Sequence, residues 1–92
     1  MKTNTHVIKI LPEYFNATAA GKKGFELRKN DRNYQERDKL IMKEWNGSEF
    51  TGREIHSYVT YILTENKYGL SDGYCALGTR IIDLVIPKKE KV

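Results

Sequence analysis

Apolar and polar residues alternate at the start of the chain and predict a strand followed by a helix. Residues 6–11 are rich in β-branched side chains, which is typical of a strand that ends at Pro12. Proline fits the first turn of a helix, and a glycine such as Gly21 commonly stops one. We therefore expect a short helix between Pro12 and Gly21, with an apolar stripe formed by Leu11, Phe15, Thr18 and Ala19.

After the expected helix the period of the pattern changes to two residues. Apolar and polar side chains alternate over residues 23–29, which predicts a half-buried strand with Phe25 and Leu27 on its apolar face. The turn-forming residues 30–33 end this strand. Its opposite face carries Gly24, Glu26 and Arg28.

The rest of the chain predicts three or four more strands and no further helix. Strands are expected at 38–45, at 54–64 and, as one strand or two, at 74–86 with a bend at Gly78. Connections this short exclude repeated parallel crossovers. We therefore predict an α+β fold, a small closed or nearly closed β-barrel of five to six mostly antiparallel strands, with one short helix after the first strand plugging an end.

Length and composition indicate one small folded domain. A chain of 92 residues forms a single core, which we place at residues 5–86, with residues 87–92 as a tail. No apolar run is long enough to span a bilayer and the N-terminus lacks a signal-peptide pattern, so we expect an intracellular, cytoplasmic protein. The lone Cys75 cannot form an internal disulfide.

Several kinds of chemistry have no support in the sequence. The chain has no cysteine pair and no closely spaced histidine pair, so we expect neither a metal site nor a cofactor. Gly-rich phosphate loops and nucleophile elbows are also missing. The isolated His6 and His56 are interpreted as structural.

Positive charge is concentrated in one segment. The net charge is +4, and residues 21–39 hold seven Lys or Arg against four Asp or Glu. A basic surface attracts polyanions, so this segment suggests a nucleic-acid partner, although a solvated strand with surface ion pairs would give the same pattern.

The same segment carries a resemblance to a known family. The run GKKxFExRKNDR at 21–32, followed by GYxxLG at 73–78, resembles a small bacterial and phage domain-of-unknown-function family in the ASCH branch of the PUA-like superfamily. The resemblance extends from about His6 to Gly78. Two positions depart from it, since Arg37 stands where the family usually has Gly and Gly24 where a Thr-like residue is common.

The resemblance implies a barrel with a flanking helix and a cleft beside the first helix and the second strand. PUA-like relatives bind RNA, so the first hypothesis is an RNA- or nucleotide-binding module. Its matching cleft residues are Lys22, Lys23, Glu26, Arg28, Lys29, Asn30 and Arg32. Unpaired bases stack on aromatic rings, for which the candidates are Trp45 and Tyr74, with Tyr58, Tyr61 and Tyr68 as alternatives.

Two other functions stay open. Some ASCH proteins resemble amidohydrolases of acetylated cytidine that use a Lys, a Thr and a Glu, and Lys23 matches that Lys. Lys23 and Glu26 are then the catalytic candidates, but Glu26 occupies the position of the Thr, so the nucleophile is missing and we expect binding rather than catalysis. The third hypothesis is a protein-interaction domain.

Overall fold

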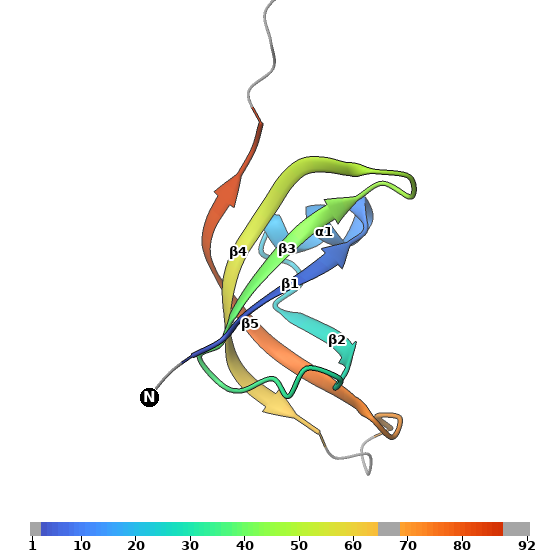
Figure 1. Ribbon diagram of the computed structural model, residues 1–92, viewed down its shortest axis with the longest axis vertical. Coiled ribbons are helices and arrows are strands. Elements are labelled where there is room, and N and C mark those ends of the chain that lie inside the picture. The colour runs from blue at the N-terminus through green and yellow to red at the C-terminus, as the bar shows by residue number, and fades with distance from the viewer. Residues whose placement is uncertain (1–2, 65–68, 88–92) are drawn as a thin grey trace, which may run out of the picture.

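The protein is a five-stranded sheet curled into a half-barrel, with one helix on its concave side (Figure 1). The computed structural model describes residues 3–64 and 69–87. The elements are β1 (Thr5–Ile10), α1 (Pro12–Ala19), β2 (Phe25–Lys29), β3 (Lys39–Trp45), β4 (Phe50–Leu63) and β5 (Tyr74–Val85).

The strand order is β1-β3-β4-β5-β2, which leaves β1 and β2 as the two edges of the sheet. β1 pairs with β3 in parallel, and the other three pairings are antiparallel. The helix between β1 and β3 is part of the crossover that a parallel pair requires. The prediction of five to six mostly antiparallel strands with one helix is confirmed, but among the described residues no ladder joins β1 to β2, so the sheet is curled rather than closed.

Most element positions agree with the prediction. α1 begins at Pro12, and Gly21 follows it with φ of 79°, in the left-handed region that favours glycine. The bend expected at Gly78 is a register shift, because β4 carries one extra residue between Val59 and Tyr61 opposite that glycine. Residues 65–68, between the strands expected at 54–64 and 74–86, and residues 88–92 of the expected tail lie outside the described residues.

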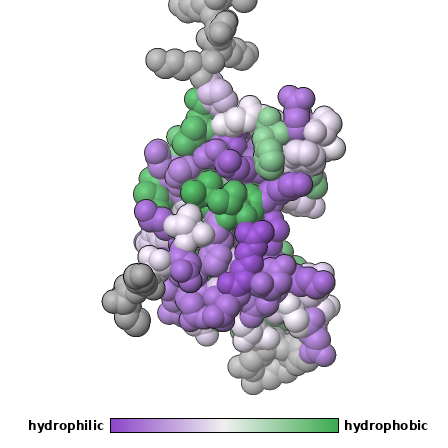
Figure 2. Space-filling model, viewed as in Figure 1, coloured by the Kyte–Doolittle hydropathy of each residue, from purple (hydrophilic) through white to green (hydrophobic). Residues whose placement is uncertain are grey.

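The core fills the concave side of the sheet against α1. Alternate residues of β1, β3 and β4 point inward, as the period of two requires, and Phe15 of α1 is completely buried among them. The buried hydrophobic residues are Ile8, Ile10, Phe15, Tyr34, Leu40, Met42, Ile55, Val59, Cys75 and Leu77. The face seen in Figure 2 is mainly hydrophilic, with a compact apolar patch over the middle of the sheet.

The orientation predicted for β2 is wrong. Phe25 and Leu27 are 52% and 57% exposed, whereas Glu26 between them is only 5% exposed. A period of two separates the faces of a strand but does not say which face is inside. Here the charged face is inside because two cations contact the Glu26 carboxylate and offset the cost of burying it.

Two arginine side chains bridge the gap between the edge strands. Arg28, on β2, donates from Nη2 to the main-chain oxygen of Lys9 on β1. Arg32, after β2, donates from Nη1 to the oxygen of Val7 at 2.6 Å. These contacts satisfy carbonyl groups that an unpaired edge would otherwise leave to water.

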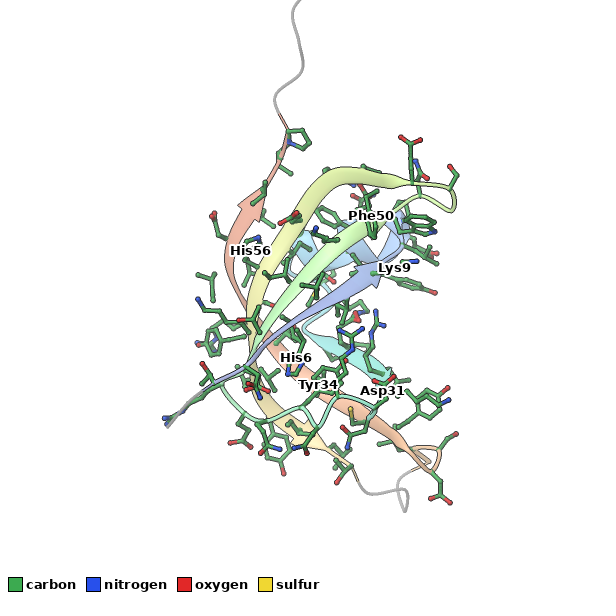
Figure 3. All side chains as sticks on the ribbon, in the orientation of Figure 1. His6, Lys9, Asp31, Tyr34, Phe50 and His56 are labelled. Atoms are coloured by element: carbon green, nitrogen blue, oxygen red, sulfur yellow. The ribbon has the colours of Figure 1, made fainter. Side chains whose placement is uncertain are left out.

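A buried polar cluster fixes the chain before β3. Asp38 accepts hydrogen bonds from the backbone N–H groups of Asn4 and Gln35, both at 3.0 Å, and its Oδ2 lies 2.8 Å from His6 Nε2. The His6 ring packs edge-on against Tyr34, with ring centroids 4.7 Å apart (Figure 3). Burial raises the pKa of Asp38, but these hydrogen bonds outweigh it, so the pKa lies below its ordinary value.

Candidate functional site

A pocket of about 470 Å³ lies between the end of β1, the start of α1 and β2. This volume lies within the range of about 300–1,000 Å³ that is typical of small-molecule sites. The residues that line it are Lys9, Ile10, Leu11, Tyr14, Lys23, Phe25, Glu26, Leu27 and Arg28.

The polar part of the pocket is a carboxylate held between two cations. Lys23 Nζ lies 2.5 Å from Glu26 Oε1, and Arg28 Nε lies 3.4 Å from Glu26 Oε2. Lys23 Nζ also donates to the main-chain oxygen of Phe25 at 2.7 Å. The Glu26 side chain is 7% exposed, against 16% for Lys23 and 30% for Arg28, so the carboxylate is the deepest of the three.

The rim of the pocket is apolar and exposed. Tyr14 and Phe25 are 45% and 52% exposed, and Leu11 and Leu27 are comparable. Lys23 Nζ lies 5.8 Å from the centroid of the Tyr14 ring and 5.1 Å from that of Phe25, so one ammonium group is close to both rings. Two exposed rings beside a charged floor give the pocket an amphipathic lining.

The turn after α1 places Lys23 in the pocket. The oxygen of Ala17 accepts hydrogen bonds from the backbone N–H groups of both Lys22 and Lys23, at 2.9 and 3.1 Å. Gly21 makes this turn possible through its positive φ. With its backbone fixed by the helix end, Lys23 reaches Glu26 three residues later.

The structure brings together three of the residues predicted for the site. Lys23, Glu26 and Arg28 meet in the pocket. Glu26 and Arg28 lie on the face of β2 that the sequence pattern assigned to them, and Lys23 reaches it from the turn before the strand. Glu26 is buried, which excludes the alternative of a solvated surface ion pair.

The other predicted residues do not line this pocket. Lys22, Lys29 and Asn30 are exposed, and Arg32 bonds to β1. Trp45 packs against Phe50, and Tyr74 pairs with Lys29 at the far end of β2. Of the alternative rings, Tyr58 and Tyr61 lie on β4 and Tyr68 is outside the described residues.

Sequence reasoning missed the rim. Lys9, Leu11 and Tyr14 come from β1, the next residue and α1, and only the tertiary fold brings them to β2. The alternating pattern places Phe25 and Leu27 on the apolar face of their strand, whereas the structure exposes both side chains. One sequence feature that points to the rim is Tyr14, an aromatic residue that lies outside the expected apolar stripe of the helix.

A second buried glutamate lies near α1 but outside the pocket. Glu44 of β3 accepts from Arg53 of β4 through both oxygens, at 2.8 and 2.5 Å, and from Thr51 Oγ1 at 2.6 Å. The Arg53 guanidinium lies 4.2 Å from the centroid of the Phe15 ring and bonds to Asn16. The hydrogen bonds from Arg53 hold the pKa of Glu44 below its ordinary value, against the opposing effect of burial.

Burial also shifts the pKa values of two side chains that do not line the pocket. Burial raises the pKa of the Tyr34 phenol and of the Cys75 thiol. Cys75 is fully buried, so it is a core residue rather than a reactive thiol. Within residues 3–64 and 69–87 there is no group of three potential metal ligands and no helix that could cross a membrane.

Comparisons with known proteins identify relatives of the whole domain. Residues 5–79 match the family described as a domain of unknown function, DUF3850. A relative from Escherichia phage P2, described as an uncharacterized 12.9 kDa protein in the GpA 3' region, is 42% identical over 92 residues. The alignment covers all of this chain and 82% of the phage protein.

Proposed function

Since the chain belongs to the DUF3850 family of domains of unknown function, we propose its function from the pocket itself: it binds a nucleotide, free or as an unpaired residue of RNA, between β1, α1 and β2. The proposal includes membership of the ASCH branch of the PUA-like superfamily. The curled sheet with a helix after its first strand supports that placement.

One observation carries the proposal: a buried carboxylate with unused acceptor capacity lies at the floor of a pocket whose rim has two exposed rings. Each carboxylate oxygen of Glu26 has one cation contact, and a carboxylate has about four acceptor positions. A buried carboxylate can accept hydrogen bonds from the exocyclic amines and ring N–H groups of bases. The floor therefore supports recognition of a base edge.

The rim supports stacking of the same base. Tyr14 and Phe25 are 45% and 52% exposed, so each ring keeps apolar surface available for a ligand beside its contact with the Lys23 ammonium group. Stacking of one base on an aromatic side chain contributes about 1–3 kcal/mol. A planar ligand between the rim and the floor would stack on the rings and donate hydrogen bonds to the carboxylate.

Cations at the pocket supply the charge that a phosphate needs. Arg28 uses its Nε and Nη2 groups within the protein, and a guanidinium has five N–H donors in total. Lys9 has no carboxylate partner among the residues that the structure describes. Phosphate binding by these groups predicts that nucleotides bind more tightly than nucleosides and that added salt weakens them.

The test uses the rim, because those residues can be changed without disturbing the fold. Titrations of the four common ribonucleoside monophosphates are compared for the wild type, Tyr14→Ala and Phe25→Ala. We expect each variant to lose about tenfold in affinity, with an unchanged midpoint of urea unfolding. Tyr74→Ala is the matched control, since Tyr74 is a 39% exposed ring that pairs with Lys29 at the far end of β2 and does not line the pocket.

The result that contradicts the proposal is equally clear. If no ribonucleotide binds at millimolar concentration, or if both rim variants bind as well as the wild type, the pocket is not a nucleotide site. A loss of affinity in Tyr74→Ala equal to that in Phe25→Ala would also exclude this location.

The contact between Lys23 and Glu26 favours one second candidate, hydrolysis of a modified nucleoside. At 2.5 Å the pair could share a proton during acid–base chemistry. Apart from the Tyr14 phenol, no described residue lining the pocket carries a hydroxyl or thiol, so water activated by Glu26 would have to be the nucleophile.

The hydrolase candidate is tested with N4-acetylcytidine and mass-spectrometric detection of cytidine. Turnover that disappears in both Glu26→Gln and Lys23→Met supports it. Absence of product at equimolar enzyme after a day removes it, and the binding proposal is unaffected by that result.

A further inference from the structure

A second aromatic and basic cluster lies directly beside the pocket. Trp45 at the end of β3 and Phe50 at the start of β4 pack edge to face, with ring centroids 4.9 Å apart. Phe50 is 48% exposed. The Nζ atoms of Lys9 and Lys43 each lie 5.8 Å from the centroid of the Phe50 ring. We call these four residues the aromatic platform.

Lys9 connects the platform to the pocket. Its ammonium group lies 4.2 Å from the centroid of the Trp45 ring, while the residue also lines the pocket. Its main-chain oxygen accepts a hydrogen bond from Arg28, which belongs to the pocket floor. Figure 3 shows Lys9 and Phe50 close to each other near the end of β1.

The charges at this junction favour an anionic ligand. Lys43 shares its charge with Glu54 at 3.8 Å, so it is partly neutralised. Lys9 contacts only the two rings of the platform through its ammonium group, among the residues described. A cation between two base-sized aromatic sites is where the phosphate that links two nucleotides would lie.

From these contacts we propose that the ligand is a single-stranded oligonucleotide of at least two nucleotides, with one base in the pocket, the linking phosphate at Lys9 and the next base on Phe50 of the aromatic platform. This inference rests on the proposed nucleotide site and specifies its ligand class. Stacking and backbone contacts are indifferent to sequence, so any base can occupy the platform.

The test compares ligands of increasing length on the same protein. Trp45 is the only tryptophan and belongs to the platform, so its fluorescence reports occupation of the second site. The probes are uridine monophosphate, a uridine dinucleotide and a uridine hexanucleotide, each with its deoxy counterpart to separate RNA from DNA. We expect the dinucleotide to bind at least tenfold more tightly than the monophosphate.

Variants of the platform separate this inference from the proposed function. Phe50→Leu keeps an apolar side chain but removes the ring, and Lys9→Ala removes the linking cation. Phe50→Leu is expected to lower dinucleotide affinity five- to tenfold and to leave monophosphate affinity unchanged. Lys9→Ala is expected to weaken both ligands, and the dinucleotide more strongly, because Lys9 also lines the pocket. Lys39→Ala is the charge-matched control, because Lys39 is an exposed cation at the opposite end of β3.

The outcomes are distinct. If monophosphate and dinucleotide bind equally and Phe50→Leu changes neither, the platform inference is wrong and the nucleotide pocket stands. If Lys39→Ala weakens the dinucleotide as much as Lys9→Ala, only general charge attraction is at work and the inference is again wrong. If no probe binds at all, the proposed function and this inference fail together.

Discussion

Glu44 and Glu26 are two buried carboxylates near the same helix, yet their surroundings differ. Glu44 has three hydrogen bonds of 2.8 Å or less, from Arg53 and Thr51. Glu26 has one contact of 2.5 Å with Lys23 and a long one of 3.4 Å with Arg28. Only Glu26 lines the pocket of about 470 Å³.

This difference separates a structural ion pair from a candidate binding group. A carboxylate whose acceptor positions are filled by a bidentate arginine and a hydroxyl joins β3 to β4 and has little capacity for a ligand. A carboxylate with fewer hydrogen bonds and a side that faces a pocket keeps acceptor positions for a ligand. A buried carboxylate whose hydrogen-bond acceptor positions are only partly filled therefore indicates the site, which burial or charge alone would not do.

The largest expected effect comes from breaking the pair at Glu44. Arg53→Met leaves the Glu44 carboxylate buried with Thr51 as its remaining partner, and we expect a loss of about 3 kcal/mol in the free energy of unfolding. Urea unfolding measures it. The double variant Arg53→Met with Glu44→Leu should recover part of the loss. A single-variant loss below about 1 kcal/mol would show that the pair is not structural.

A second effect appears as pH is lowered. The pKa of Glu44 lies below its ordinary value of 4.5 and that of Asp38 below 3.8, so the unfolded chain takes up protons first. The stability from these groups is complete above their ordinary values and is lost as pH falls through the folded-state values. Urea unfolding from pH 7 to pH 3 should show this decline.

Two variants check that assignment. Glu44→Gln and Asp38→Asn should each flatten the decline below pH 4.5, because each removes one group with a lowered pKa. An unchanged slope in both variants would mean that other carboxyl groups control the acid dependence.

A smaller loss in the free energy of unfolding is expected when Glu26 is changed. Glu26→Gln keeps the shape of the side chain and should cost about 1 kcal/mol, less than Glu44→Gln, because it gives up one strong hydrogen bond rather than three. Thermal unfolding with and without nucleotide then compares ligand binding by the two variants. Nucleotide should raise the melting temperature of Glu44→Gln but not that of Glu26→Gln, and the reverse pattern would contradict the comparison.

The smallest expected effect lies outside the surroundings of Glu26 and Glu44, and it is a gain in stability rather than a loss. Arg37 has φ of 77°, in the left-handed region, at the position where the resemblance led us to expect Gly. Arg37→Gly should stabilise the protein by about 0.5–1 kcal/mol, since glycine adopts this conformation without steric cost. Urea unfolding measures the gain, and a destabilised variant would show that the Arg37 side chain contributes contacts that outweigh the relief.

The sequence was sufficient for the elements because their signals are local. Pro12 and Gly21 mark the helix, and alternating residues mark β1, β3 and β4 within a few positions. Strand partners are not local information, so the parallel β1–β3 pairing and the open edge between β1 and β2 could not be read from the pattern.

The candidate site was predictable only in its charged part. Lys23, Glu26 and Arg28 stand close together in the chain, so their grouping was visible. The rim of the pocket is not visible in the sequence, since Tyr14 reaches it from α1 and the apolar character of Phe25 predicts a buried side chain rather than an exposed one. Burial of Glu26 depends on the energy of its two ion pairs, which a hydrophobicity pattern does not contain.

Arg28 belongs to both the floor of the pocket and the junction between the edge strands, where it bonds to the oxygen of Lys9. Rotation of this one long side chain can therefore alter the width of the pocket while every backbone ladder stays intact. A rotamer change of this kind requires far less energy than the separation of two paired strands. For the proposed nucleotide site, this means that the pocket can change its width without any change in the sheet.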